Sequence, residues 1–180
     1  MSVNVESESP SSESSAATNK QEYNVFRDSP VRFLGYANEV GESFRYQFPR
    51  FVTPTYIVAF GYCLMDATSN GYSAWNSFDP TKTERSRPVQ TALATGDTLL
   101  WQILASVCIP GVTINMIVKA SRFAVSRTTV LPTVAAAWLP TGMGLASVPL
   151  IIQPIDHAVD YMLDNTVREW IAEESKQKPS

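Results

Sequence analysis

The stretch LPTVAAAWLPTGMGLASVPLIIQPI, residues 131–155, decides the class of fold. It contains four prolines and no charged side chain. Inside a soluble helix each interior proline costs about 3 kcal/mol. Membrane helices tolerate proline better, because neighbouring helices, hydroxyl side chains and local kinks satisfy the freed carbonyl groups. The stretch therefore favours a helix surrounded by lipid over the interior of a soluble helical domain.

This stretch belongs to the longest of three uncharged runs in the 180-residue chain. Residues 128–155 form a run of 28, residues 98–118 a run of 21 and residues 51–65 a run of 15. About 20 mostly apolar helical residues cross the hydrocarbon core of a bilayer. A soluble domain of this size rarely needs two such runs, because its helices show a polar face on every turn. The two longer runs qualify as membrane spans by length.

The two longer runs differ in their expected insertion energy. Residues 98–118 hold ten Leu, Ile, Val or Phe side chains. These contribute about −3 to −6 kcal/mol on the insertion scale before Gln102 and Asn115 are counted against them. Residues 133–153 hold seven such side chains, one Trp and several alanines, so their insertion is weaker but still favourable.

The shortest run crosses a bilayer only if it is extended. As a helix, residues 51–65 reach about 22 Å, and an extension back to Tyr46, with Arg50 reaching the headgroups, completes the span. A soluble helical bundle with a break at each proline is the alternative. We predict an all-α integral membrane protein with amphipathic flanking helices and about three transmembrane helices, at 46–65, 98–118 and 133–153.

The two ends of the chain differ from this apolar middle. Residues 1–24 are rich in Ser and Glu and contain no Leu, Ile, Phe or Trp, so they cannot bury enough apolar area to offset chain entropy. We predict a disordered tail at 1–24, one membrane-embedded helical domain at 25–172 and a flexible end at 173–180. The acidic tail resembles neither a secretory signal nor a cleaved presequence, so any targeting signal is expected further inside the chain.

Amphipathic helices are predicted on both sides of the spans. Ser29 and Pro30 are typical of a helix start, and Pro154 marks a second start, of a helix that lies at the membrane interface or docks under the bundle. The first helix is expected to turn Arg32, Glu39, Glu42 and Arg45 to solvent and Leu34, Ala37, Gly41, Phe44 and Phe48 to the protein or membrane. The second has an apolar stripe of Ile155, Val159, Met162, Leu163, Trp170 and Ile171 against Asp156, Asp160, Asp164 and Arg168.

Prolines and small residues predict the shape and packing of the spans. The pair Pro110-Gly111 is expected to break the second span, whereas Pro140, Pro149 and Pro154 kink or bound the third. Gly142 and Ala146 have the small-xxx-small spacing that lets helix backbones approach closely. The polar residues Gln102, Asn115 and Gln153 are expected to hydrogen-bond between helices. A transport pathway usually needs ionisable groups, and neither longer span contains one.

Little in the sequence points to chemistry. His157 is the only histidine, so a histidine metal site or a Ser-His-Asp triad would depend on it, and a solvated helix residue is the simpler interpretation. Cys63 and Cys108 lie in apolar runs and are interpreted as buried small residues. A pI of 5.2 without a basic and aromatic patch argues against nucleic acid. We predict no catalytic, cofactor-binding or metal-binding residue, and a protein that is not an enzyme.

Three segments resemble one known family. VRFLGYANEVGESFR (31–45), DTLLWQILASVCIPGVTIN (97–115) and GLASVPLIIQPIDHAVDYMLDNTVR (144–168) are similar to the mitochondrial fission process protein 1 family, also called mitochondrial protein of 18 kDa. The resemblance covers about residues 25–170. It implies an integral protein of the mitochondrial inner membrane that promotes division of the organelle, and it brings no catalytic residues.

Function and orientation follow as hypotheses. A non-enzymatic scaffold or adaptor would bind membrane lipid and other inner-membrane proteins and act indirectly on the division machinery, with no known small-molecule substrate. A small channel, transporter or permeability modulator is the alternative.

The loop KASRFAVSR (119–127), together with Arg45 and Arg50, contains slightly more basic residues than the opposite side of the predicted spans. The positive-inside rule therefore places the N-terminus in the matrix.

Overall fold

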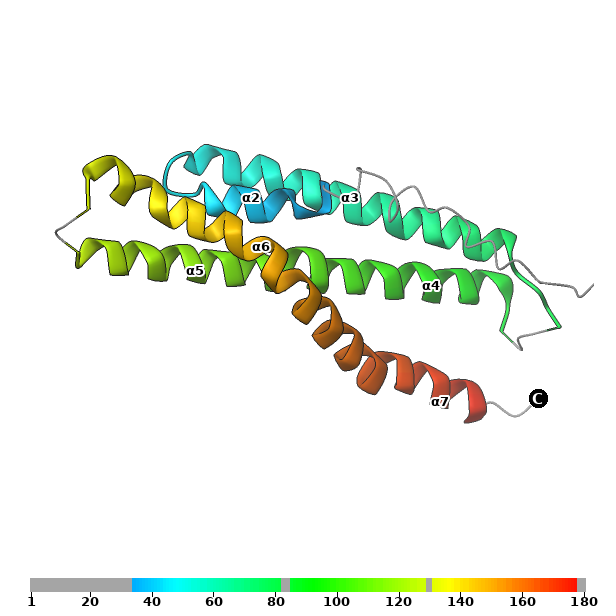
Figure 1. Ribbon diagram of the computed structural model, residues 1–180. Helices are drawn as coiled ribbons and strands as arrows, with labels where there is room; N and C mark the ends of the chain where they lie inside the picture. Colours follow the sequence, from blue (N-terminus) through cyan, green and yellow to red (C-terminus); the bar gives the residue numbers. More distant parts are fainter. Residues whose placement is uncertain (1–33, 82–84, 129–130, 178–180) are drawn as a thin grey trace, which may run out of the picture.

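The computed structural model describes residues 34–81, 85–128 and 131–177, which form helices and short connections with no strand among them (Figure 1). The predicted all-α class is confirmed for these residues, and the tail predicted at 1–24 lies outside them. In chain order, the elements are α2 (Ala37–Ser43), α3 (Pro49–Asn76), α4 (Arg87–Gln102), the π-helix η2 (Ile103–Cys108), α5 (Ile109–Ser126), α6 (Thr133–Leu163), the π-helix η3 (Asp164–Arg168) and α7 (Glu169–Gln177).

Two continuous rods organise the molecule. One consists of α4, η2 and α5, and the other of α6, η3 and α7. Helix α3 lies along the first rod, α2 folds back beside α3, and α6 starts next to α5 and crosses the first rod toward α4 (Figure 1). Where the rods cross, Ile155, Val159 and Leu163 of α6 pack against Ala105 of η2. The α2–α3 turn and the α5–α6 connection therefore lie at the same end of the bundle.

Two helices are long and apolar enough to cross a membrane, namely Arg87–Ser126 and Thr133–Glu173. They contain the predicted spans 98–118 and 133–153. The core helix of a soluble protein is mostly buried, whereas 39% of the most apolar window of the first helix and 17% of that of the second are buried inside the protein. The span at 46–65 stays a prediction: it falls on α3, which begins at Pro49 and continues to Asn76.

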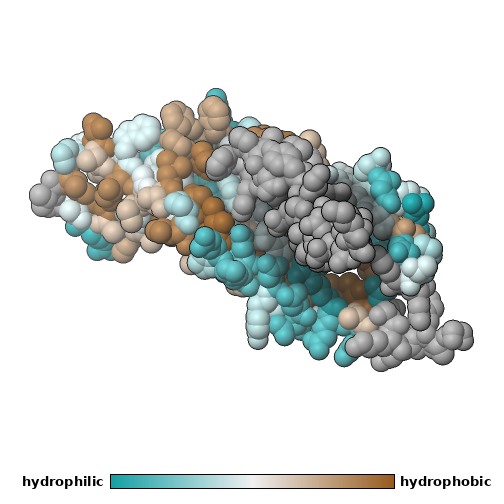
Figure 2. Space-filling view, turned by 45° about the vertical axis from the view of Figure 1, so that its right-hand side comes forward, coloured by the Kyte–Doolittle hydropathy of each residue, from teal (hydrophilic) through white to brown (hydrophobic). Residues whose placement is uncertain are grey.

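Several polar side chains lie inside the bundle beside its apolar core, and many large apolar side chains lie outside it. Ile57, Val134 and Leu150 are 68%, 72% and 74% exposed. On the face shown in Figure 2, apolar residues gather toward the end with the α2–α3 turn and hydrophilic ones toward the C-terminal half. Exposed apolar side chains in this number are unusual for a soluble helical bundle, and they mark contacts with a membrane or with other proteins. The buried polar residues are Asn38, Glu39, Glu42, Ser43, Asp66, Gln102, Ser106 and Thr141.

The prolines do not divide the helices as predicted. Pro110 does not break the first rod, because the wider π turn of η2 ends two residues before it and lets the helix continue as α5. Pro154 starts no new helix: it lies inside α6 with Pro140 and Pro149. Each rod is therefore one element where the sequence suggested several.

The close helix approach occurs at a different glycine from the one predicted. Gly142 has nothing within 4 Å of the position that a Cβ atom would take, and Ala146 is exposed. A Cβ on Gly144 would instead lie 2.7 Å from both Ser43 Oγ and Val118 Cγ2. Gly144 is thus where α6 packs against α2 and α5.

The C-terminal end is helical further than predicted. Residues 173–177, assigned to a flexible end, continue α7 to Gln177. Arg85 Nη2 donates a hydrogen bond of 2.5 Å to the carbonyl of Ile171. The connection before α4 therefore holds α7 in place.

Candidate functional site

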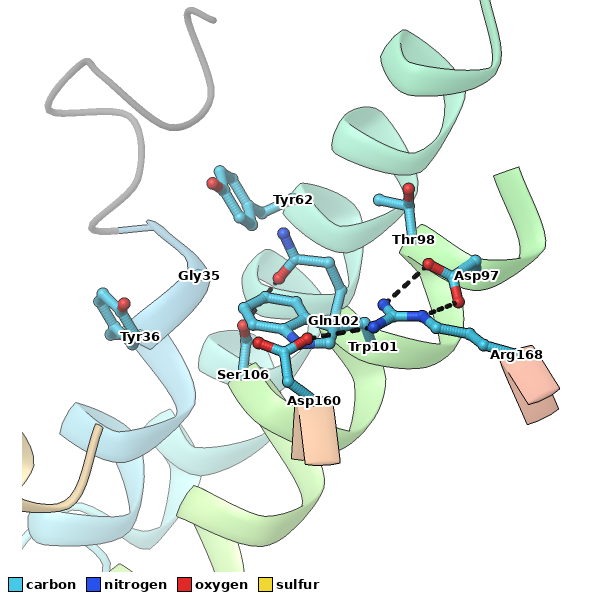
Figure 3. A pocket seen from close by; sticks show the side chains of 10 residues that line it. All are labelled: Gly35, Tyr36, Tyr62, Asp97, Thr98, Trp101, Gln102, Ser106, Asp160 and Arg168. Atoms are coloured by element: carbon cyan, nitrogen blue, oxygen red, sulfur yellow. Dashed lines mark hydrogen bonds and ion pairs between the residues drawn. The ribbon is translucent and has the colours of Figure 1, made fainter. Parts of the chain in front are cut away.

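A cavity of about 430 Å³ lies among α3, α4 and the C-terminal half of α6 (Figure 3). Three aromatic residues, three charged residues and several small polar groups line it, so it combines ring faces with hydrogen-bonding groups. Its lining residues are Gly35, Tyr36, Tyr62, Asp97, Thr98, Trp101, Gln102, Ser106, Asp160 and Arg168.

An ion-pair network closes one side of the cavity. Arg168 in η3 donates to both carboxylate oxygens of Asp97 on α4, at 2.7 Å from Nε and 2.9 Å from Nη2. Its Nη1 donates to Asp160 at 3.3 Å (Figure 3) and to Asp164 at 2.8 Å. The bidentate geometry fixes both partners in orientation. Arg168 thereby ties the second rod to the first.

A buried polar cluster lies at the inner wall of the cavity. Gln102 Nε2 donates to Asp66 Oδ2 at 2.6 Å, and Ser106 Oγ donates to Gln102 Oε1 at 2.7 Å. Asn70 Nδ2 reaches Asp66 Oδ1 at 3.2 Å. The cluster joins α3 to α4 and η2, so the interhelical role predicted for Gln102 is confirmed. Asp66 is fully buried, at 0% exposed. The sequence did not predict this position inside the protein.

The acids of α2 also point inward, which corrects the amphipathic pattern predicted for this segment. Glu39 and Glu42 are 0% and 1% exposed, whereas Leu34 and Phe48 are both 48% exposed. The prediction assumed that the open side of the helix faces water. In this bundle the polar partners lie inside, so the polar face of α2 turns toward the other helices.

Glu42 is the centre of a second polar cluster. Its carboxylate accepts hydrogen bonds from Asn115 at 2.7 Å, Tyr56 at 3.0 Å and Arg45 at 2.5 and 2.6 Å. Burial opposes ionisation here, but these donors outweigh it and lower the pKa of Glu42. The bond to Asn115 confirms the interhelical role predicted for that residue. Gln153, the third residue of that prediction, is exposed on α6.

Glu39 and Asn38 lie between the two clusters. Both carboxylate oxygens of Glu39 and the Oδ1 atom of Asn38 are buried and accept no hydrogen bond from another residue among those described. Asn38 Nδ2 donates to the carbonyl of Val107, next to Ser106, at 3.1 Å. Glu39 lies on α2, outside the two candidate spans, and burial raises its pKa to about 8. Its carboxyl group therefore holds a proton at neutral pH.

The residues weighed for chemistry in the sequence lie apart from these clusters. His157 is exposed on α6. Cys63 is buried as predicted, whereas Cys108 is exposed and that part of the prediction is wrong; both thiols are free. The i+4 spacing of Asp160, Asp164 and Arg168 was visible in the sequence, but their partner Asp97 lies 71 residues before Arg168. Only the fold brings that pair together.

Among the described residues, the fold defines an all-helical protein with two helices long and apolar enough to cross a membrane. The chain belongs to the mitochondrial fission process protein 1 family. Residues 78–163 match the family described as Mitochondrial 18 KDa protein (MTP18).

Three relatives share the name Mitochondrial fission process protein 1. The chain is 44% identical to the Caenorhabditis elegans protein over 146 residues, which is 81% of this chain and 87% of the relative. It is 43% identical to the Danio rerio protein over 167 residues, or 92% and 99% of the two chains. The Homo sapiens protein is 43% identical over 149 residues, or 82% and 88%. No solved structure matches the chain significantly.

Proposed function

We propose that the protein is a non-enzymatic integral protein of the mitochondrial inner membrane that promotes mitochondrial fission as a scaffold or adaptor. The names of its relatives support the process. The observation that carries the membrane assignment is the exposed apolar surface of the two long helices, on which Val134 is 72% and Leu150 74% exposed. Lipid around the bundle would keep these apolar side chains away from water. Large exposed apolar patches of this kind mark contacts with a membrane or with other proteins.

The arrangement of basic residues supports one orientation. The α2–α3 turn and the α5–α6 connection lie at one end of the bundle (Figure 1). Their sequences and flanks contain Arg45, Arg50, Lys119, Arg122 and Arg127. With α3 as a third span, all five lie on the same side of the membrane, and the positive-inside rule makes that side the matrix.

A pair of lysine substitutions tests the membrane assignment. Leu150→Lys places a charge in the predicted third span, which costs about 2.5–3.5 kcal/mol in insertion energy. Trp170→Lys is the matched control, since Trp170 is 65% exposed on the same rod but follows Arg168, whose partner Asp97 bounds the predicted second span. We expect alkaline carbonate to release the Leu150→Lys protein from mitochondria and to leave the wild type and the control in the membrane. Release of the wild type, or equal retention of all three, would contradict the assignment.

The role in fission is tested in cells. Depletion of the protein is expected to give elongated, hyperfused mitochondria, and excess protein is expected to give fragments. Normal morphology in both conditions would exclude the role. Proximity labelling from each terminus reports the side and the neighbouring proteins, and an adaptor should label inner-membrane proteins reproducibly.

A second candidate function is modulation of inner-membrane permeability. The buried clusters around Gln102 and Glu42 favour it, because polar groups inside membrane helices are costly and mark pathways or packing contacts. Purified protein in liposomes should then conduct ions or move solute. An inert reconstitution with a persistent effect on morphology would favour the scaffold.

A further inference from the structure

The carboxyl group of Glu39 occupies an exceptional place in the bundle. It is 0% exposed, and neither of its oxygens accepts a hydrogen bond from another residue among those described. Glu42, one turn further along α2, is equally buried but has three partners. An ionised carboxylate without a donor is strongly unfavourable in an apolar surrounding. Glu39 is therefore a neutral acid that binds one proton.

The charged and titratable groups around Glu39 are few. Within α2 the nearest is Glu42, one turn away. On α3, Tyr56 and Cys63 are close enough to couple electrostatically with Glu39. Helices α5 and α6 also pack against α2, and the residues through which they approach it include Gly111, Asn115 and Gly144, none of which is ionisable. The cations near this end of α2 have other partners: Arg45 pairs with Glu42, and Arg122 lies over the Tyr46 ring.

On one side of Glu39, polar groups lead to the cavity. Asn38 donates to the carbonyl of Val107, and the adjacent residue Ser106 is hydrogen-bonded to Gln102. Ser106 and Gln102 both line the cavity, as do Asp97 and Asp160 (Figure 3). Buried polar groups of this kind are the usual partners of ordered water, and a chain of such waters would carry protons between Glu39 and the cavity.

On the other side, polar groups lead toward the basic end of the bundle. Glu42 follows Glu39 by one helical turn, where Cβ atoms lie about 5–6 Å apart. Its carboxylate contacts Asn115, Tyr56 and Arg45, and the Arg45 side chain is 40% exposed. Glu39 thus lies between a cavity and an exposed arginine.

The length of this row matches a bilayer. Gln102 and Asn115, one in each cluster, are 13 residues apart on one rod, or about 20 Å at 1.5 Å per residue. Asp97 and Asn115, the two ends of the row on this rod, are 18 residues apart, or about 27 Å. The hydrocarbon core is about 30 Å thick. The row therefore covers most of the predicted apolar layer.

We propose that Glu39 is a proton relay, which passes protons between the cavity at Asp97 and the end of the bundle at Arg45. In each step the carboxylic acid gives its proton to water on one side, and the carboxylate takes a proton from water on the other. Charge and atoms balance without an oxidant or reductant. This proposal goes beyond the scaffold function and gives the permeability candidate a specific ion.

Proton flux into liposomes tests the relay. The full-length protein is reconstituted with a trapped pH-sensitive dye, and a potassium gradient with valinomycin supplies the driving force. We expect the lumenal pH to change faster with the wild type than in protein-free liposomes. With Glu39→Gln, the rate of pH change should fall to that of protein-free liposomes. Glu169→Gln, an isosteric change at an exposed residue of α7, is the matched control and keeps the wild-type rate.

Two further measurements separate proton binding from folding. Infrared spectroscopy should show a protonated carboxylic acid band at neutral pH that is absent in Glu39→Gln and present in Glu169→Gln. Ser106→Ala, which leaves the acid in place, should lower the flux while keeping the band. Wild-type flux equal to that of empty liposomes, or Glu39→Gln flux equal to wild type, would overturn the relay. Membrane extraction and mitochondrial morphology test the scaffold separately, so either proposal can fail alone.

Discussion

Arg168 and Asp97, 71 residues apart in the chain, meet through two parallel hydrogen bonds of 2.7 and 2.9 Å. Arg168 lies near the end of the second rod and Asp97 near the middle of α4. The pair fixes the angle at which α6 leaves the bundle and forms one wall of the cavity. Both side chains are about one-third exposed, at 32% and 33%, so solvent screens part of their attraction.

The Arg168–Asp97 pair should contribute measurably to stability. In a double-mutant cycle with Arg168→Gln and Asp97→Asn, we expect a coupling energy of about 1 kcal/mol, near the upper end for partly exposed ion pairs. Thermal unfolding in detergent, followed by circular dichroism, measures it. Arg127→Gln is the control, because its guanidinium lies over the Phe123 ring. Additive effects of the two substitutions would show that the pair does not hold the rods together.

A side chain at Gly144 should disrupt the packing of α6. Gly144→Val would place atoms against Ser43 and Val118, and overpacking of this kind typically costs about 1–3 kcal/mol. Gly142→Val is the matched control, because that position has open space around it. The melting temperature should fall for the first variant and stay near wild type for the second. Equal melting temperatures would mean that α6 does not approach α2 and α5 at Gly144.

Removal of the Gln102 amide should destabilise the cluster at the cavity wall. Gln102→Met keeps the approximate length of the side chain but takes away the donor to Asp66 and the acceptor of Ser106. A buried polar group left without its partner costs about 1–3 kcal/mol. Gln153→Met, at an exposed position of the second rod, should leave the melting temperature nearly unchanged. The prediction is wrong if the two variants unfold at the same temperature.

Stability should depend on pH through Glu39. Its folded pKa of about 8 lies above the unfolded value of 4.5, so between these values the folded state binds more protons than the unfolded state. The free energy of unfolding therefore falls as pH rises through this range. In Glu39→Gln this component of the slope should disappear, whereas Glu169→Gln should keep it. Thermal unfolding at a series of pH values checks the difference, and parallel slopes for wild type and Glu39→Gln would refute it.

The sequence predicted the long helices because uncharged length is a local property. Residues 98–118 and 133–153 read as spans from composition alone, and both lie within the two helices that could cross a membrane. The partners of Gln102 and Asn115 were expected on other helices, because a polar group in an apolar run needs a hydrogen-bond partner on a neighbouring helix. No local sequence pattern identifies that partner, so only the structure shows that the partners are Asp66 and Glu42.

The acids of α2 were misplaced because the usual rule for amphipathic helices assumes water outside. The spacing of Glu39 and Glu42 gives one polar face, but not the direction in which it points. The turn at residues 44–47 and the packing of Gly41 against Thr55 bring that face against the other helices. The prediction of a helix break at Pro110 was wrong for a similar reason. The π-helix η2 precedes this proline and lets the helix continue, and no local sequence pattern predicted that change in helical winding.

The second rod extends without interruption from Thr133 to Gln177, which is 45 residues and about 66 Å at 1.5 Å per residue. A hydrocarbon layer of about 30 Å accommodates less than half of that length. The crossing at Ala105 and the Arg168–Asp97 pair keep this rod against the first one as far as Arg168, so with both rods embedded as proposed it crosses the layer at a slant (Figure 1). Only the turns after Arg168 then extend past Asp97. Trp170, 65% exposed in these turns, is thereby held at the membrane surface, where the aromatic rings of membrane proteins commonly lie.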